Sequence, residues 1–144
     1  MTQANRDYLF VYGTLMSGFQ VPITEQIHAS AFSVGRAYCY GKLFDVGGYP
    51  GVQLVEQKQK VFGELLAIPA SKFNNLIQAV DRYEECTLQN SQPHEYVRTK
   101  TSVYLCQSSM PYVAWIYRYN YPLENHRHIQ SGDYRLCTDI NARR

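Results

Sequence analysis

Two segments of the sequence carry residues that could do chemistry, and the first is a short apolar run that ends at a glycine. Tyr8 to Tyr12 is aromatic and branched, as in a buried strand. Gly13 and Gly18 bound the small-residue loop that follows, and glycines let backbone amides come close to a ligand. Such amides could hold an anion or a carbonyl oxygen, although an ordinary strand and turn would show the same pattern.

The second segment carries an acid, Glu84, among apolar residues. From Pro69 to Glu85 the spacing predicts a helix, with Ser71 as a candidate N-cap. The apolar stripe of this helix consists of Phe73, Leu76, Ile77 and Val80. At about 100° per residue, Glu84 falls near the middle of that stripe. If the helix continues through residue 84, the carboxylate faces the interior, and if the helix ends earlier, Glu84 is solvated.

An interior carboxylate without a partner is expected to have a raised pKa, because burial penalises its charged form. A glutamic acid shifted from about 4.3 to about 6–7 can both accept and donate a proton near neutral pH. We therefore expect Glu84 to be an acid/base group, a role worth roughly 10²–10⁴ in rate.

Length and composition restrict the class of protein. The 144 residues fit one domain covering residues 1–144. The sequence has no apolar run of about 18 residues and its N-terminus has no apolar signal segment, so we expect a cytoplasmic protein without a membrane contact. The net charge is +2 and charges of both signs are interspersed, which argues against a nucleic-acid partner.

Neither the cysteines nor the histidines indicate a metal or another cofactor. The cysteines are Cys39, Cys86, Cys106 and Cys137. They are widely spaced, without a Cys-x-x-Cys pair, and are expected to be free thiols with no signature of a catalytic nucleophile. His126 and His128 have the spacing of metal ligands on a strand, but no third ligand is evident, so we expect a surface pair.

Strand signals dominate the remaining chain. Residues 22–30 fit a short helix or an irregular segment, and we expect strands at residues 8–12, 32–46, 51–56, 61–68, 96–106 and 112–119. The pair around the polar turn at residues 57–60 is expected to form one hairpin, and the last two strands a second. Because hairpins outnumber crossover units, the predicted fold is α+β with a mostly antiparallel sheet that could close into a barrel.

Motifs spread along the chain carry a resemblance to a known family. They are Tyr12-Gly-Thr-Leu15 with Gly18, Gly48-Tyr-Pro50, Gly63-Glu64, Asp81-x-x-Glu84, Tyr96-x-Arg98 and Tyr117. In this order they resemble the γ-glutamylcyclotransferase-like family, which includes the AIG2-like proteins, from about Tyr8 to about Tyr134. The resemblance implies a small mixed β-barrel with flanking helices. It also implies an enzyme that releases 5-oxoproline from γ-glutamyl compounds and uses no metal.

The resemblance assigns roles to particular residues. Backbone amides for the glutamyl group would come from Tyr12, Gly13, Thr14 and Leu15, and the substrate cavity would also be lined by Tyr49, Tyr96 and Tyr117. The family's acid/base glutamate falls on Glu84, which the helical spacing indicates independently. Glu85 replaces the glycine that commonly follows this glutamate, and the usual polar residue a few positions beyond Gly18 is missing. The leaving amine is therefore left open, as is the oligomeric state.

In the implied reaction, the α-amine of a γ-glutamyl group attacks its own γ-carbonyl and closes a five-membered ring. The substrate brings its own nucleophile, so the protein must only fold it into an attack geometry and move protons. Glu84 would take a proton from the ammonium group and return it to the leaving amine.

Two other interpretations use the same residues. In the first, the tyrosine-lined cavity is a non-catalytic module that binds a small amino-acid-like ligand, and Glu84 pairs with the ammonium group of that ligand. In the second, Glu64 and Glu84 are the paired carboxylates of a hydrolase, although Glu64 is more simply explained as an ordinary strand residue.

Overall fold

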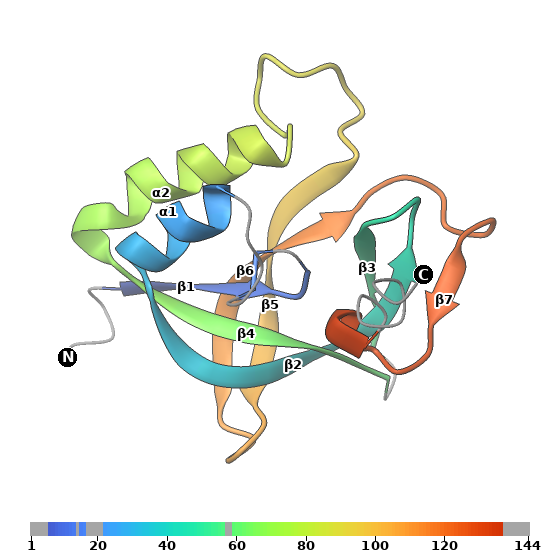
Figure 1. Cartoon of the computed structure of the whole chain (residues 1–144), viewed down its shortest axis with the longest axis horizontal. Coiled ribbons are helices and arrows are strands. Elements are labelled where there is room, and N and C mark those ends of the chain that lie inside the picture. The colour runs from blue at the N-terminus through green and yellow to red at the C-terminus, as the bar shows by residue number, and fades with distance from the viewer. Residues whose placement is uncertain (1–5, 14, 17–21, 57–58, 137–144) are drawn as a thin grey trace.

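A closed barrel of five strands with mixed directions forms the centre of the structure (Figure 1). The computed structural model describes residues 6–13, 15–16, 22–56 and 59–136. The barrel strands are β1 (Arg6–Val11), β2 (Phe32–Asp45), β4 (Lys60–Pro69), β5 (Tyr96–Leu105) and β6 (Pro111–Tyr119). The pairs β1–β4, β4–β2, β2–β5 and β5–β6 are antiparallel, and the parallel pair β6–β1 closes the ring. The predicted α+β fold with a mostly antiparallel barrel is confirmed.

Helices α1 (Pro22–Ser30) and α2 (Ala70–Tyr83) lie together on one side of this barrel (Figure 1). Residues 22–30, left open by the sequence, are helical. The buried residues of α2 are Leu76, Ile77, Ala79 and Val80. The helix therefore presents the predicted apolar face to the strands below it.

The predicted N-cap of α2 is wrong. The N-cap position is Pro69, without a side-chain hydrogen bond, and Ser71 lies exposed in the first turn. The reason is that β4 ends at Pro69 and the chain enters the helix at the next residue, so no polar connecting residue stands between strand and helix.

The first predicted hairpin is also wrong. β3 (Pro50–Leu54) and β4 do not pair with each other, because both lie antiparallel to β2. Leu54 is opposite Gly41 and Lys60 is opposite Tyr40, so β3 and β4 follow one another along β2. β2 lies between β3 and β4 in the order of the sheet, so the two strands occupy opposite edges of β2. β2 is long enough to template both strands, and the short β7 (Arg127–Ile129) pairs with its far end.

The second predicted hairpin, β5–β6, is confirmed, with Tyr96 opposite Tyr119 and Tyr104 opposite Pro111. This long ribbon extends below the rest of the barrel in Figure 1.

Strands β1 and β4 are buried on both faces. Leu9, Phe10 and Val11 are at most 3% exposed, and Leu65 to Ile68 are fully buried. One side of these strands faces the barrel interior and the other lies under α2, which explains their continuous apolar sequences.

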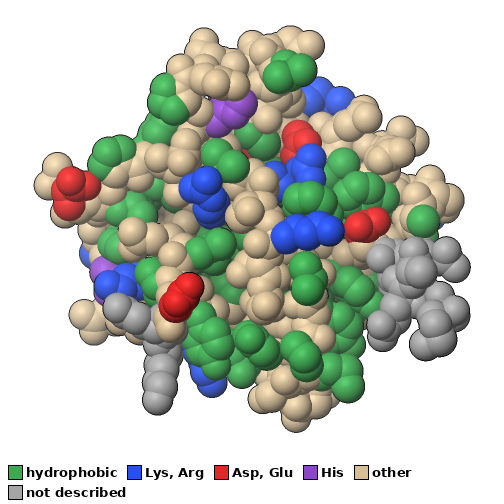
Figure 2. Space-filling model, turned by 180° about the vertical axis from the view of Figure 1, so that it is seen from behind, with side chains coloured by type: hydrophobic (Ala, Val, Ile, Leu, Met, Phe, Trp, Pro, Cys, Tyr) green, Lys and Arg blue, Asp and Glu red, His purple; other side chains and the backbone are tan. Residues whose placement is uncertain are grey.

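Figure 2 shows the face of the molecule opposite to the view of Figure 1. There, hydrophobic side chains are interspersed with basic and acidic ones (Figure 2). Among the described residues, no helix has the length and apolar character that a membrane span would need.

Gly63, in β4, is tightly packed against β1. A Cβ at this position would overlap the Val11 carbonyl oxygen and lie 2.8 Å from the Phe10 ring. We expect Gly63→Ala to lower the free energy of unfolding by about 1–3 kcal/mol in urea denaturation, because the core must shift to admit a methyl group. Ser71→Ala is the control and should change it by less than about 0.5 kcal/mol, because Ser71 caps nothing. An unchanged stability of Gly63→Ala would contradict this packing.

Candidate active site

A cavity of about 600 Å³ lies between the end of β1, the end of α2 and the segment that precedes β5. This volume is within the usual range of small-molecule sites, about 300–1,000 Å³. Its lining residues are Phe10, Val11, Tyr12, Gly13, Leu15, Tyr49, Pro50, Tyr83, Glu84, Glu85, Gln89, Asn90, Ser91, His94, Glu95, Tyr96, Tyr117 and Tyr121.

The structure brings the predicted site residues together around this cavity. Those that line it are Tyr12, Gly13, Leu15, Tyr49, Glu84, Tyr96 and Tyr117. Thr14 lies outside the described residues. Segments that are far apart in the sequence therefore meet at one place, and the roles implied by the resemblance become geometrically compatible.

Glu84 stands where α2 ends. It is the C-cap residue, and its backbone N–H donates to the Val80 carbonyl oxygen at 2.9 Å, so the helix does reach residue 84. The side chain is half-buried in the cavity wall. Within the described part of the chain, no group forms a hydrogen bond with its carboxylate. The carboxylate is thus available to a ligand.

The surroundings of Glu84 raise its pKa to about 7. Burial is the largest cause, because it penalises the charged form, and the negative charges of Glu95 and Asp81 add to it. An acid with this pKa exchanges protons readily at neutral pH.

Buried tyrosines form rigid walls next to Glu84. The Tyr12 hydroxyl donates to the Tyr117 carbonyl oxygen at 2.6 Å, and the Tyr96 hydroxyl donates to the Pro50 carbonyl oxygen at 2.5 Å. Burial, together with the nearby charge of Glu84, raises the pKa of Tyr12 well above its usual range. These phenols are therefore neutral and fixed in position, and they shape the cavity without titrating near neutral pH.

Gly13 is required at the start of the loop because Pro50 lies against it. A Cβ on Gly13 would be 2.6 Å from the Pro50 Cγ. The Gly13 carbonyl accepts a hydrogen bond from the Met16 N–H at 3.0 Å, so the chain turns at once after β1. The glycine thus lets the loop after β1 approach the start of β3.

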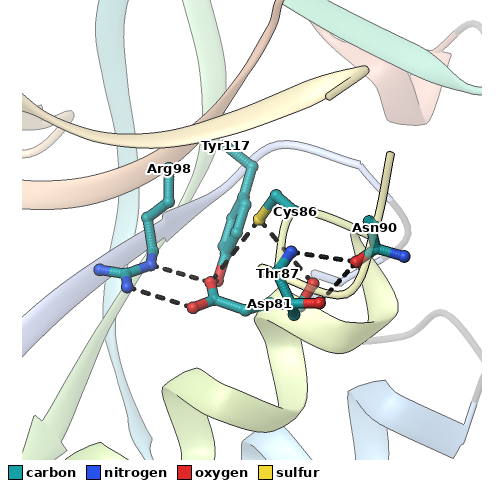
Figure 3. Close-up of polar contacts among 6 residues, drawn as sticks. All are labelled: Asp81, Cys86, Thr87, Asn90, Arg98 and Tyr117. Carbon is teal, nitrogen blue, oxygen red and sulfur yellow. Dashed lines mark hydrogen bonds and ion pairs between the residues drawn. The ribbon is translucent and has the colours of Figure 1, made fainter. Parts of the chain in front are cut away.

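Asp81 ties the end of α2 to the barrel (Figure 3). Its carboxylate receives two hydrogen bonds from Arg98, at 2.8 and 3.1 Å, and one from the Tyr117 hydroxyl at 2.6 Å. The Arg98 guanidinium also lies 4.4 Å from the centre of the Trp115 ring. Charge-assisted, two-point contacts of this kind fix both distance and direction. Glu84 follows Asp81 by about one helical turn, so this network also fixes the position of Glu84.

The segment after α2 is closed by its own hydrogen bonds. The Thr87 N–H and hydroxyl both donate to the Asn90 Oδ1, at 3.0 and 2.7 Å, and Figure 3 shows this pair beside the Asp81 network. Glu85, which replaces the glycine of the family pattern, has a positive φ of 57°. A residue other than glycine is strained there, which accounts for the glycine usually found at this position.

The described cysteines are free, as expected, and Cys137 lies outside the described residues. Burial raises the pKa of the Cys39 thiol to about 12 and that of the Cys86 thiol to about 11. Neither thiol would therefore provide a thiolate nucleophile at neutral pH.

Glu95 is a cavity residue that the sequence did not indicate. It accepts a hydrogen bond from the Tyr49 hydroxyl at 2.5 Å, and its charge contributes to the raised pKa of Glu84. Glu95 directly precedes the first residue of β5, so the alternation of strand side chains does not predict where it points. Its position beside Tyr96 in a family motif was the available signal.

The residues of the paired-carboxylate interpretation and of the histidine pair do not meet in the cavity. Glu64, in β4, does not line the cavity, so it is not paired with Glu84 there. His126 lies against the Tyr119 ring, and His128 against the Phe44 ring. No cluster of three or more potential metal-ligating side chains occurs within residues 6–13, 15–16, 22–56 and 59–136.

The fold and the cavity together define the class: a small mixed β-barrel with packed helices and a half-buried glutamate facing a ligand-sized cavity. The family model described as gamma-glutamyl cyclotransferase, AIG2-like, matches residues 9–136. The chain therefore belongs to this family. A comparison with curated proteins gave no match.

Solved structures show the same fold. YkqA from Bacillus subtilis has a TM-score of 0.69 at 22% identity, over 96% of this chain and 43% of YkqA, so the chain spans less than half of that protein. An AIG2-like protein from Mus musculus has a TM-score of 0.63 at 22% identity, with 83% and 82% of the two chains covered. A structure titled gamma-glutamyl cyclotransferase has a TM-score of 0.53 at 16% identity, with 85% and 69% covered.

The Asp81 network can be tested by stability. Asp81→Asn should lower the free energy of unfolding by about 2 kcal/mol, because it leaves the partly buried Arg98 without its counter-charge. Tyr117→Phe should lower it by about 1 kcal/mol through loss of one hydrogen bond. Tyr112→Phe is the matched control and should be near neutral, since the hydrogen bond that its hydroxyl makes within the described residues goes to the sulfur of Met110, a weak acceptor. Equal stabilities of the three variants in urea denaturation would disprove this role.

The raised pKa of Glu84 predicts a pH-dependent stability. Between the usual 4.5 and about 7, the folded protein keeps a proton that the unfolded chain releases, so this contribution is lost as pH rises through about 7. Glu84→Gln removes the effect. Its unfolding free energy relative to wild type should increase by roughly 2 kcal/mol from pH 5 to pH 8. A difference that stays constant between pH 5 and pH 8 would contradict the shift.

Proposed function

We propose that the protein is a γ-glutamyl cyclotransferase-type enzyme that releases 5-oxoproline from a γ-glutamyl amine or γ-glutamyl amino acid. The observation that carries this proposal is the Glu84 carboxylate, which has no hydrogen-bond partner among the described residues and is half-buried in a ligand-sized cavity with a pKa of about 7. Membership of the gamma-glutamyl cyclotransferase, AIG2-like family supports it.

In the proposed reaction, the α-amine nitrogen of the substrate bonds to its own γ-carbonyl carbon, and the bond from that carbon to the leaving amine breaks. The α-ammonium nitrogen must lose one proton before it attacks and a second as the ring closes, and the leaving nitrogen must gain one to leave as an amine, which then takes up the other as an ammonium group. Glu84 takes the first proton, delivers it to the leaving nitrogen, and then passes the second from the ring nitrogen to the released amine, so it ends the cycle in its starting state. No acyl-enzyme is required, which is consistent with the raised pKa of the Cys39 and Cys86 thiols.

The cavity walls would supply the remaining contribution, which is orientation. A γ-glutamyl chain is flexible and must be bent before its ends can react, and holding reacting groups in place can remove a large part of a barrier. Tyr12 and Tyr96 are held by hydrogen bonds to the backbone and present fixed surfaces for this purpose. The amides of the loop from Gly13 to Leu15 would hold the glutamyl carboxylate or the developing oxyanion.

The test is 5-oxoproline release by wild type and Glu84→Gln, a variant that keeps the side-chain shape and removes the base. We expect the rate to fall by roughly 10²–10⁴-fold. The kcat/KM of wild type should rise with pH through about 7, as Glu84 loses its proton. Glu124→Gln, in an exposed segment away from the cavity, is the control. A wild-type rate in the Glu84→Gln variant would refute the role of Glu84. Binding of γ-glutamyl compounds without turnover by wild type would favour the binding module.

A further inference from the structure

The cavity has a buried inner end and an exposed outer rim, both built largely from tyrosines. The inner tyrosines, at most 8% exposed, are Tyr12, Tyr96 and Tyr117. The outer rim consists of Tyr49, Tyr83 and Tyr121, which are 40–46% exposed and line the same cavity. The two ends therefore offer different surfaces to one ligand.

Two rings of the outer rim, those of Tyr49 and Tyr121, are held in place before any ligand binds. The Tyr121 hydroxyl donates to the Pro93 carbonyl oxygen at 2.9 Å, and the Tyr121 ring meets the Tyr119 ring edge-on at 5.9 Å. The Tyr49 hydroxyl donates to Glu95. Because these hydroxyls already have partners, the rings can receive an apolar ligand at little cost in side-chain entropy. A flat aromatic group would gain most from such surfaces.

The charges on the cavity wall point to a second property of the ligand. Glu84, Glu85 and Glu95 line the cavity, and no Lys or Arg is found among its described lining residues. His94 also lines it, with its Nε2 at 3.4 Å from the Asn90 carbonyl oxygen. A carboxylate on the outer part of a ligand would face like charges and meet no fixed cation. Leaving groups that are free amino acids are therefore disfavoured.

From these observations we propose that the leaving amine of the substrate carries an aromatic ring and no carboxylate. The inference rests on the proposed function, which places the γ-glutamyl group at the inner end beside Glu84. The leaving amine then extends to the outer rim, where its ring packs against Tyr83 and Tyr121. Glu95, held by Tyr49, acts there as a specificity-determining residue that rejects carboxylates.

The experiment compares four γ-glutamyl compounds that differ only in the ring and the carboxylate. They are the γ-glutamyl derivatives of 2-phenylethylamine, phenylalanine, ethylamine and alanine. We expect the highest kcat/KM for the phenylethylamine derivative. Removal of the ring should lower kcat/KM by about tenfold, and addition of the carboxylate should also lower it by about tenfold.

Variants assign the two effects to residues. Tyr83→Ser and Tyr121→Ser should each reduce the ratio of kcat/KM between the phenylethylamine and ethylamine derivatives to about threefold or less. Glu95→Gln should reduce the penalty for the carboxylate to a similar extent. Leu88→Ser and Glu124→Gln are the controls, because both residues are exposed and lie outside the cavity, and both effects should persist in them.

The outcomes separate this inference from the proposed function. Equal kcat/KM for the four compounds, or ring and carboxylate effects that survive in the cavity variants, would overturn the inference and leave the cyclotransferase proposal intact. No 5-oxoproline from any of the four, nor from other γ-glutamyl dipeptides, would overturn the cyclotransferase proposal and the inference with it.

Discussion

The two-point contact between Asp81 and Arg98 is the interaction on which the geometry of the cavity depends. It joins the last turn of α2 to β5, and the Tyr117 hydroxyl adds β6 to the same carboxylate. A helix end is otherwise the part of a helix most prone to fray. Because Asp81 is bound to two strands, the C-cap residue Glu84 is held at a defined position in the cavity wall.

Fixing Glu84 in this way has an electrostatic cost, which appears as a raised pKa of its carboxyl group. The carboxylate is half-buried near Asp81 and Glu95, both of which oppose its ionisation. Neither neighbour can turn away to relieve the repulsion, because Asp81 is bound by Arg98 and Glu95 by Tyr49. The raised pKa of Glu84 therefore follows first from its burial, and then from the charges of two neighbours whose own hydrogen bonds hold them in place.

What the sequence could predict was local. Glu84 was placed on the inner face because helical spacing repeats every few residues, and the β5–β6 hairpin was evident because its strands adjoin in sequence. The pairing of β3 and β4 with β2 was missed because the sequence pattern does not show that β2 is long enough to pair with both, although β2 directly precedes β3. The contacts of Asp81 with Arg98 and of Tyr49 with Glu95 were missed because they join side chains of separate elements. Sequence spacing carries no information about contacts between separate elements.

Pro50 shows how contacts between separate elements together shape the cavity. Pro50 packs against Gly13 at the end of β1, and its carbonyl accepts the hydroxyl of Tyr96 at the start of β5. One residue of β3 thereby links two barrel strands that do not pair with each other directly. Because β3 is held in register by β2, the spacing between the loop after β1 and the tyrosines of β5 is set by the sheet. The inner end of the cavity is consequently fixed by the barrel itself. The exposed tyrosines of the outer rim are not fixed by strand pairing, so substitutions there can change which ligands fit without changing the barrel.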